Sequence, residues 1–279
     1  MDESHIVMAV EFFSAALPVL YGILVVIYGL SFFKPASRTS SVRSPFLIGV
    51  LLLHLVYLAL RVLAYDHPPI TNVFEVMTLM AAAITTAYMY IEWRTATSST
   101  GVFILLLAFA FQTVSSIFIR STVKIPDYLH SLVLGFHVSS ALLGYTAISL
   151  SAVYGLLYLL LYHEIKSTRF GVIYNRLPNL ETLEIMSHKA EVFGFASLTV
   201  AISIGLLWLP RVFKDFSYFD PKLVGTIGIW ILYAVGLGAR RTFGLQGRKM
   251  MVLSLIAFGC VFLSMTVINL FLSGFHSFH

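Results

Sequence analysis

Apolar residues along the chain fall into eight long runs that are separated by short polar segments. Each run is close to the roughly 20 residues that an α-helix needs to cross the hydrocarbon core of a bilayer. The pattern predicts an all-α, polytopic membrane protein with about eight transmembrane helices in a single integral membrane domain, 1–279. The predicted spans are 10–33, 46–65, 73–93, 102–119, 132–162, 193–213, 223–239 and 250–274.

The longest polar segment lies between the fifth and sixth runs, at 163–192. Within it Leu180, Leu183 and Met186 stand at helical spacing among charged residues. This pattern is typical of a short amphipathic helix that lies along the membrane surface. We therefore expect a cytoplasmic loop at 163–192 that contains such a helix.

The composition agrees with the hydrophobic pattern. Hydrophobic residues make up 58% of the chain and charged residues 11%, whereas soluble domains carry about 25% charged residues. The single cysteine, Cys260, excludes an intrachain disulfide and a zinc site built on paired cysteines. The chain starts Met1-Asp2-Glu3, acidic where a cleavable signal peptide would be basic, so the first run is expected to remain as a helix.

The lysines and arginines predict the orientation, because cytoplasmic loops carry an excess of them. One set of alternating loops holds the larger share, and we assign it to the cytoplasm, which places both termini outside. That set comprises Lys34, Arg38, Arg43, Arg94, Lys166, Arg169, Arg176, Lys189, Arg240, Arg241, Arg248 and Lys249. The opposite set comprises Arg120, Lys124, Arg211, Lys214 and Lys222. This distribution accounts for the net charge of +5 without a nucleic-acid partner, and it favours a bacterial plasma (inner) membrane.

Polar side chains inside the second predicted span are the first candidates for chemistry. His54 and Arg61 are seven residues apart and therefore share one face of the helix. Arg61 is near the outer end, where its long side chain can reach the interface, but His54 is close to the middle of the span. Strongly polar groups at this depth need a protein partner, a cavity or a ligand.

The segment that follows combines a helix stop with a helix start. Pro68 and Pro69 end the second helix, and Asn72 is placed to cap the third. Glu75 occupies the third helical position, close to a capping-box arrangement. A carboxylate at the membrane edge still needs a partner, and Arg61 is the nearest candidate.

Histidines gather at the predicted outer ends of two spans. His130 and His137 share a face of the fifth span, while His276 and His279 follow the last one. Such a set fits axial ligation of haem iron, and it fits a proton relay or a divalent metal site equally well. We expect the remaining loop histidines to be ordinary surface residues. These are His5, His163 and His188.

Four stretches, in order along the chain, resemble the integral membrane cytochrome c assembly family, the haem-handling group that includes CcsA and the HemX-type proteins. They cover the chain from the second predicted span to its end. The stretches are Leu53-His54 with Arg61 and 69–75 (Pro-Ile-Thr-Asn-Val-Phe-Glu); Phe136-His137-Val138 with Tyr145; 177–181 (Leu-Pro-Asn-Leu-Glu) with 194–199 and 205–208; and 274–278 (Gly-Phe-His-Ser-Phe).

The resemblance implies roles for individual residues. His137 and His276 stand where the family has two external haem-ligating histidines, and His54 matches one of two embedded histidines. The implied cofactor is haem b, bound non-covalently. Asp220 and Tyr218 lie in the segment that corresponds to the family's tryptophan-rich surface against the porphyrin. Pro69, Asn72 and Glu75 match its Pro-x-x-Asn-x-Tyr/Phe-Glu signature.

Two departures from the family pattern bear on activity. The tryptophan-rich signature is reduced to 216–222, Phe-Ser-Tyr-Phe-Asp-Pro-Lys, which lacks tryptophan. Gly238 occupies the place where the second embedded histidine is expected. An embedded paired-histidine haem site is therefore not expected, and the compact size with the Leu-Pro-x-Leu-Glu stretch favours the HemX-like branch.

We expect a haem-handling protein of cytochrome c biogenesis that presents haem on the outer face beside a partner protein of that pathway. The sequence contains no self-contained catalytic motif, so a part in a haem-attachment synthase is left open. Two alternatives remain: a HemX-like membrane adaptor that regulates haem biosynthesis, and a proton-coupled secondary transporter that uses His54, Arg61 and Glu75.

Overall fold

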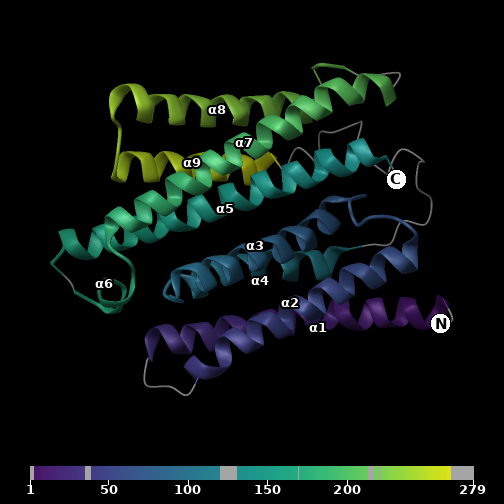
Figure 1. Ribbon diagram of the computed structural model, residues 1–279, viewed down its shortest axis with the longest axis horizontal. Helices are drawn as coiled ribbons and strands as arrows, with labels where there is room; N and C mark the ends of the chain where they lie inside the picture. Colours follow the sequence, from purple (N-terminus) through teal and green to yellow (C-terminus); the bar gives the residue numbers. More distant parts are fainter. Residues whose placement is uncertain are drawn as a thin grey trace. The chain divides into compact units, whose positions relative to one another are not determined.

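A computed structural model describes residues 3–34, 39–119, 131–168, 170–212, 217–219 and 221–264. Within these ranges every regular element is a helix, which confirms the all-α prediction. The helices are α1 (Glu3–Phe33), α2 (Thr39–Tyr65), α3 (Val73–Thr95), α4 (Gly101–Phe118), α5 (Leu132–Lys166), α6 (Val172–Arg176), α7 (Leu180–Val212), α8 (Pro221–Phe243) and α9 (Arg248–Leu263) (Figure 1).

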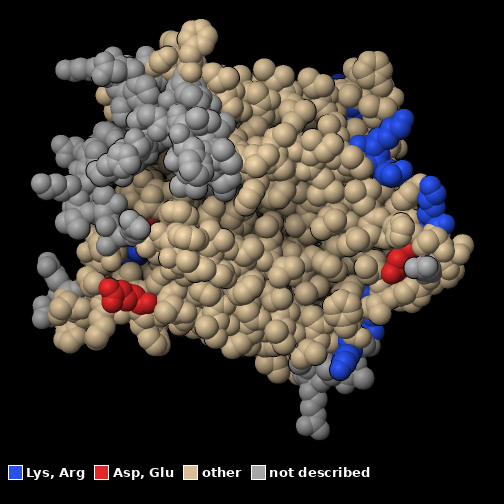
Figure 2. Space-filling view, turned by 180° about the vertical axis from the view of Figure 1, so that it is seen from behind, with Lys and Arg blue, Asp and Glu red and all other residues tan. Residues whose placement is uncertain are grey.

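Seven of the helices are long and apolar enough to cross a membrane: α1, α2, α3, α4, α5, α7 and α8. Each overlaps one of the first seven predicted spans, although α7 begins well before the predicted start of the sixth, and the chain is a polytopic membrane protein. The eighth predicted span, 250–274, is described only as far as Leu263 in α9 and one further residue. On the face in Figure 2, Lys, Arg, Asp and Glu occupy small areas among other residues, as membrane burial requires.

The sequence predicts a single domain, and the structure divides the chain into two compact units, Met1–His130 and Ser131–His279. In the first unit α1 packs against α2 and α4, and α3 packs against α4 and α2. Its interior contains fully buried tyrosines rather than aliphatic residues alone: Tyr21, Tyr28, Tyr57 and Tyr88. Their hydroxyl groups allow polar side chains on facing helices to be satisfied inside an apolar unit.

In the second unit α5 and α7 form a long pair, with α9 against α5 and with α8 against both α7 and α9 (Figure 1). Small residues bring α5 and α7 close together. A Cβ on Gly194 would lie 2.9 Å from Ile148 Cγ1 and 3.1 Å from the Gly144 carbonyl oxygen. Small residues at helix contacts let backbones approach in membranes, where packing is the main attraction between helices.

The segment 163–192 differs from its prediction as a loop. α5 continues to Lys166, the five-residue α6 follows, and α7 begins at Leu180 and runs without a break through the sixth span. Leu180, Leu183 and Met186 therefore belong to a 33-residue helix rather than to a separate surface helix. The helix persists through its charged turns because Glu184 has partners, the Arg240 guanidinium and the Gly247 N–H.

Candidate functional site

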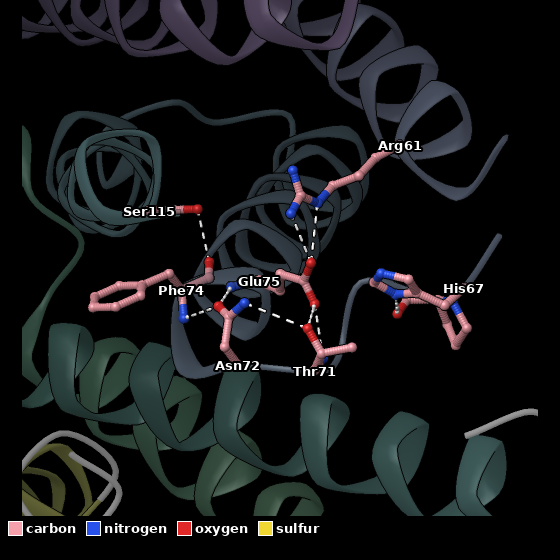
Figure 3. Close-up of polar contacts among 8 residues, drawn as sticks. Arg61, His67, Thr71, Asn72, Phe74, Glu75 and Ser115 are labelled. Carbon is pink, nitrogen blue, oxygen red and sulfur yellow. Dashed lines mark hydrogen bonds and ion pairs between the residues drawn. The ribbon is translucent and has the colours of Figure 1, made fainter. Parts of the chain in front are cut away.

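The connection between α2 and α3 carries the most complete polar cluster of the first unit (Figure 3). Asn72 caps α3, as predicted: its side-chain oxygen accepts hydrogen bonds from the N–H groups of Phe74 and Glu75, both at 3.0 Å. The Ser115 hydroxyl donates to the Phe74 carbonyl at 2.7 Å, which fastens the first turn of α3 to α4. The start of α3 is therefore fixed both by its own cap and by a neighbouring helix.

Arg61 and Glu75 form the expected ion pair. Arg61 Nη2 lies 2.7 Å and Nε 3.2 Å from Glu75 Oε1, and the two side chains are 3% and 0% exposed. Glu75 Oε2 accepts from the Thr71 N–H and the Thr71 hydroxyl, both at 2.7 Å. The Glu75 carboxylate therefore accepts hydrogen bonds from Thr71, the residue before the N-cap. In a capping box it would accept from the N–H of the N-cap residue itself, Asn72.

These contacts explain how a charged pair persists at this depth. Each carboxylate oxygen has two donors, and the guanidinium also stacks 5.0 Å from the ring centre of Tyr65. A buried pair is tolerable only when its remaining hydrogen-bonding capacity is satisfied. The pair joins the end of α2 to the start of α3 and thereby fixes the connection that contains Pro69.

His54 lies in a hydrogen-bonded row that crosses all four helices of the first unit. Its Nδ1 is 2.9 Å from the Tyr21 hydroxyl of α1, and its Nε2 is 2.9 Å from the Thr78 hydroxyl of α3. Thr78 donates in turn to Gln112 of α4 at 2.8 Å. Because Thr78 gives its proton to Gln112, it must accept one from His54, so Nε2 carries a proton and both ring nitrogens are engaged.

His67 is a buried residue that the sequence analysis did not single out. It is 1% exposed, Nδ1 donates to the Pro68 carbonyl at 2.8 Å, and Nε2 is buried without a hydrogen-bond partner among the described residues. Its burial comes from tertiary packing at the α2–α3 connection. Nothing in the local sequence pattern distinguishes it from an exposed loop histidine.

In the second unit His137 lies in the second turn of α5 and is half-buried. Its Nδ1 donates to the Ala201 carbonyl of α7 at 2.8 Å. This bond selects the tautomer in which Nε2 carries the lone pair, and it fixes the plane of the ring. The same arrangement, one ring nitrogen on a backbone carbonyl and the other on the metal, is common among metal-ligating histidines.

The structure describes some of the other residues singled out from the sequence, but not all of them. Tyr218 is 61% exposed, next to the exposed Phe219 between α7 and α8. His276 and Asp220 lie outside the described residues. Gly238 lies on the exposed side of α8, where a Cβ would meet nothing within 4 Å.

The chain matches the family described as Cytochrome C assembly protein over residues 70–276. It belongs to the cytochrome c assembly protein family. Among curated proteins it is 26% identical to Protein HemX of Bacillus subtilis (strain 168) over 258 residues, 92% of each chain. It is 25% identical to the cytochrome c biogenesis protein CcsA of Trieres chinensis, in an alignment that covers 93% of each chain. It is 26% identical to CcsA of Prochlorococcus marinus (strain NATL1A) over 286 residues, covering 91% of this chain and 90% of that one.

Membership confirms the family that the sequence motifs resemble and supports a haem-handling role in cytochrome c assembly. The family match begins at Ile70, inside the connection that Arg61 and Glu75 hold. Among the described residues no group of three or more His, Cys, Asp or Glu could hold a metal ion.

Proposed function

We propose that the protein holds haem b, non-covalently, on the outer side of the membrane for cytochrome c assembly, with His137 and His276 as the axial ligands. The observation that carries the proposal is the hydrogen bond from His137 Nδ1 to the Ala201 carbonyl. It orients the imidazole and selects the tautomer in which Nε2, the nitrogen that would bind iron, carries no proton. Ala201 belongs to α7, so the packing of α5 on α7 sets the position of this ligand.

Other residues have supporting parts in the proposal. The exposed rings of Tyr218 and Phe219 would cover part of the porphyrin, beside Asp220. The clamp of Arg61, Glu75 and Asn72 would hold the α2–α3 connection in one shape. With both termini outside, as the charge distribution predicts, this connection and the start of α5 share the outer side. The distribution of lysine and arginine also supports the proposed plasma-membrane location. On the outer side, an extracytoplasmic partner would bring the apocytochrome.

A second part of the proposal concerns the passage of haem near His54. Both ring nitrogens of His54 are hydrogen-bonded, so contact with iron would require Thr78 or Tyr21 to release one of them. Gly238 offers no second ligand on α8. Passage by this route therefore needs a rearrangement within the first unit.

The experiment is an absorption spectrum of detergent-purified protein with added haem, oxidised and reduced. We expect a bis-histidine spectrum in the wild type that is lost in the His137→Ala/His276→Ala double variant. His163→Ala, an exposed histidine in the last turn of the same helix as His137, is the matched control and should keep the spectrum. An unchanged Soret band in the double variant would exclude these ligands.

One observation favours a second candidate function, that of a membrane adaptor. α6 is anchored to α5 because Glu164 accepts from the N–H groups of Gly171 and Tyr174. Three apolar side chains around this turn are exposed: Phe170, Val172 and Tyr174. Co-purification of a soluble protein that depends on these side chains, tested with a Phe170→Ser/Tyr174→Ser variant, would favour the adaptor. Haem binding that is unaffected by their loss would separate the two functions.

A further inference from the structure

A face of α7 in the second unit carries three titratable side chains that the proposed haem site does not use. Glu184, His188 and Glu191 are spaced by four and three residues, so they lie along one side of the helix. α8 and the start of α9 pack beside this helix and supply Arg240, Tyr233 and Gly247. The whole group lies in or beside the candidate spans of α7 and α8.

Glu184 has two partners within this group. Its Oε1 lies 3.2 Å from Arg240 Nη2 and accepts from the Gly247 N–H at 2.9 Å. The guanidinium and this carboxylate neutralise each other, and the backbone N–H at the start of α9 adds a donor. Arg240, the arginine of this group, is therefore already paired with Glu184 through Nη2.

Glu191 has no comparable partner. It is 5% exposed, and its Oε1 lies 3.8 Å from the position of a Cβ on Gly236, so the carboxyl rests against the backbone of α8. No hydrogen bond to this carboxyl occurs among the described residues. A buried carboxylate without donors is strongly unfavourable, and binding one proton removes the charge.

Three further buried polar atoms around Glu191 also lack partners in the part of the chain that the structure describes. They are His188 Nδ1, Tyr233 Oη and Arg240 Nη1. Tyr233 is 1% exposed and within electrostatic reach of Glu191, and His188 is half-buried one turn away on the same face. Unpaired buried polar atoms are rare in folded proteins, so several in one place indicate a built site rather than a packing accident.

We propose that Glu191, with His188 and Tyr233, forms a proton-binding site between α7 and α8. One proton from the aqueous phase forms an O–H bond on the Glu191 carboxyl, and no group is oxidised or reduced. His188 is the relay to the surface because it is half-buried, whereas Glu191, one turn away on the same helix face, is buried. The Tyr233 hydroxyl, which interacts electrostatically with Glu191, has the chemistry to donate to a carboxylate or to accept from a protonated carboxyl.

The charge balance of the group indicates that the site binds one proton. With Glu184 and Arg240 paired, the remaining set has one negative charge without the proton and none with it. The other titratable or charged groups that face the site or its partners belong to α5, α8 and α9. They are Tyr158, which interacts with Glu184, Cys260, which interacts with Tyr233, and Arg240, which interacts with both His188 and Glu191. None of them supplies a second unpaired carboxylate.

The test is infrared difference spectroscopy of the purified full-length protein between acidic and alkaline buffer, in H2O and in D2O. We expect one protonated-carboxyl band that shifts in D2O, disappears in Glu191→Gln and moves in Tyr233→Phe. Glu181→Gln, an exposed carboxylate on the same helix, should leave the band unchanged. His188→Gln should slow the H/D exchange of the band several-fold without removing it.

The proposal is overturned if the wild type shows no such band or if the band persists in Glu191→Gln. Should Glu191→Gln fail to fold, Glu191→Asp decides the matter, since the proposal requires a band at a shifted position. Haem is absent from these samples, so the result is independent of the proposed haem ligation.

Discussion

At the residue scale, Arg61 and Glu75 show what an ion pair needs inside a membrane protein. The Coulomb attraction alone does not offset the loss of hydration of two buried charges. In this protein the two N–H groups of Arg61 and the N–H and O–H groups of Thr71 replace the lost water around the carboxylate. Replacement of one partner alone therefore lowers the free energy of unfolding strongly. Replacement of both partners together lowers it much less.

This asymmetry gives a prediction. Replacement of one partner, Arg61→Met or Glu75→Leu, leaves a buried charge without its counter-ion and should destabilise the protein by about 3–5 kcal/mol. The Arg61→Met/Glu75→Leu double variant should lose less than either single variant. Denaturant unfolding in detergent micelles measures the three free energies. A double variant that is as unstable as the sum of the single variants would show that the two residues act independently.

The cap of α3 allows a smaller effect to be measured nearby. Asn72→Ala removes the acceptor of the Phe74 and Glu75 N–H groups and should cost about 1 kcal/mol. Asn72→Asp keeps an acceptor at the N-terminus of the helix and should preserve most of the stability. The same unfolding measurement applies. Equal losses in both variants would contradict a capping role.

At the element scale, the sequence predicts those features that depend on local pattern. The first seven spans, the cap at Asn72 and the pairing of Arg61 with Glu75 follow from apolar run length and from groups close together in the chain. The sequence predicts a loop with a short amphipathic helix at 163–192 and a span that begins at 193, whereas the structure has one helix, α7, from Leu180 to Val212. The partner of Glu184 is Arg240, on α8, and a local window cannot reveal it. The burial of His67 escaped prediction for the same reason.

Close packing of α5 on α7 is a property of the element pair, and glycines test it. Gly194→Ala would place a Cβ 2.9 Å from Ile148 Cγ1 and 3.2 Å from the Ile148 backbone nitrogen, and backbone atoms cannot move aside easily. We expect a loss of about 1–3 kcal/mol from overpacking. Gly238→Ala on α8 is the matched control, because nothing lies within 4 Å of its Cβ.

The control should be neutral or stabilise α8 by about 0.5–1 kcal/mol, since alanine loses less backbone entropy than glycine in a helix. Because His137 donates to Ala201 of α7, Gly194→Ala should also weaken haem binding if the proposed ligation is right. If the Gly194→Ala variant had the same free energy of unfolding as the wild type, α5 and α7 could move apart to admit the methyl group without loss of stability.

At the scale of the whole molecule, the charge distribution and the helix order together determine which groups can meet. If each of the seven candidate spans and the further apolar helix α9 crosses the membrane, successive helices run in opposite directions across it. The excess of lysine and arginine lies in the connections that follow α1, α3, α5 and α8 and in the helical residues near them, with Lys189 farther inside α7. If these loops are cytoplasmic, His137 and the exposed Tyr218–Phe219 segment face outward, as haem presentation requires, whereas α6 faces the cytoplasm, as an adaptor surface requires.

The orientation can be tested with single cysteines in a Cys260→Ser background, because Cys260 is the chain's only cysteine. Ser217→Cys, between α7 and α8, should react with a membrane-impermeant maleimide on intact cells. Thr97→Cys, between α3 and α4, should react only after the membrane is opened. Both positions are exposed and both changes are small, so a difference in labelling reports the side of the membrane rather than burial. The reverse pattern would place His137 on the cytoplasmic side, and the proposed outer haem site would then fail for lack of access to the compartment where it must act.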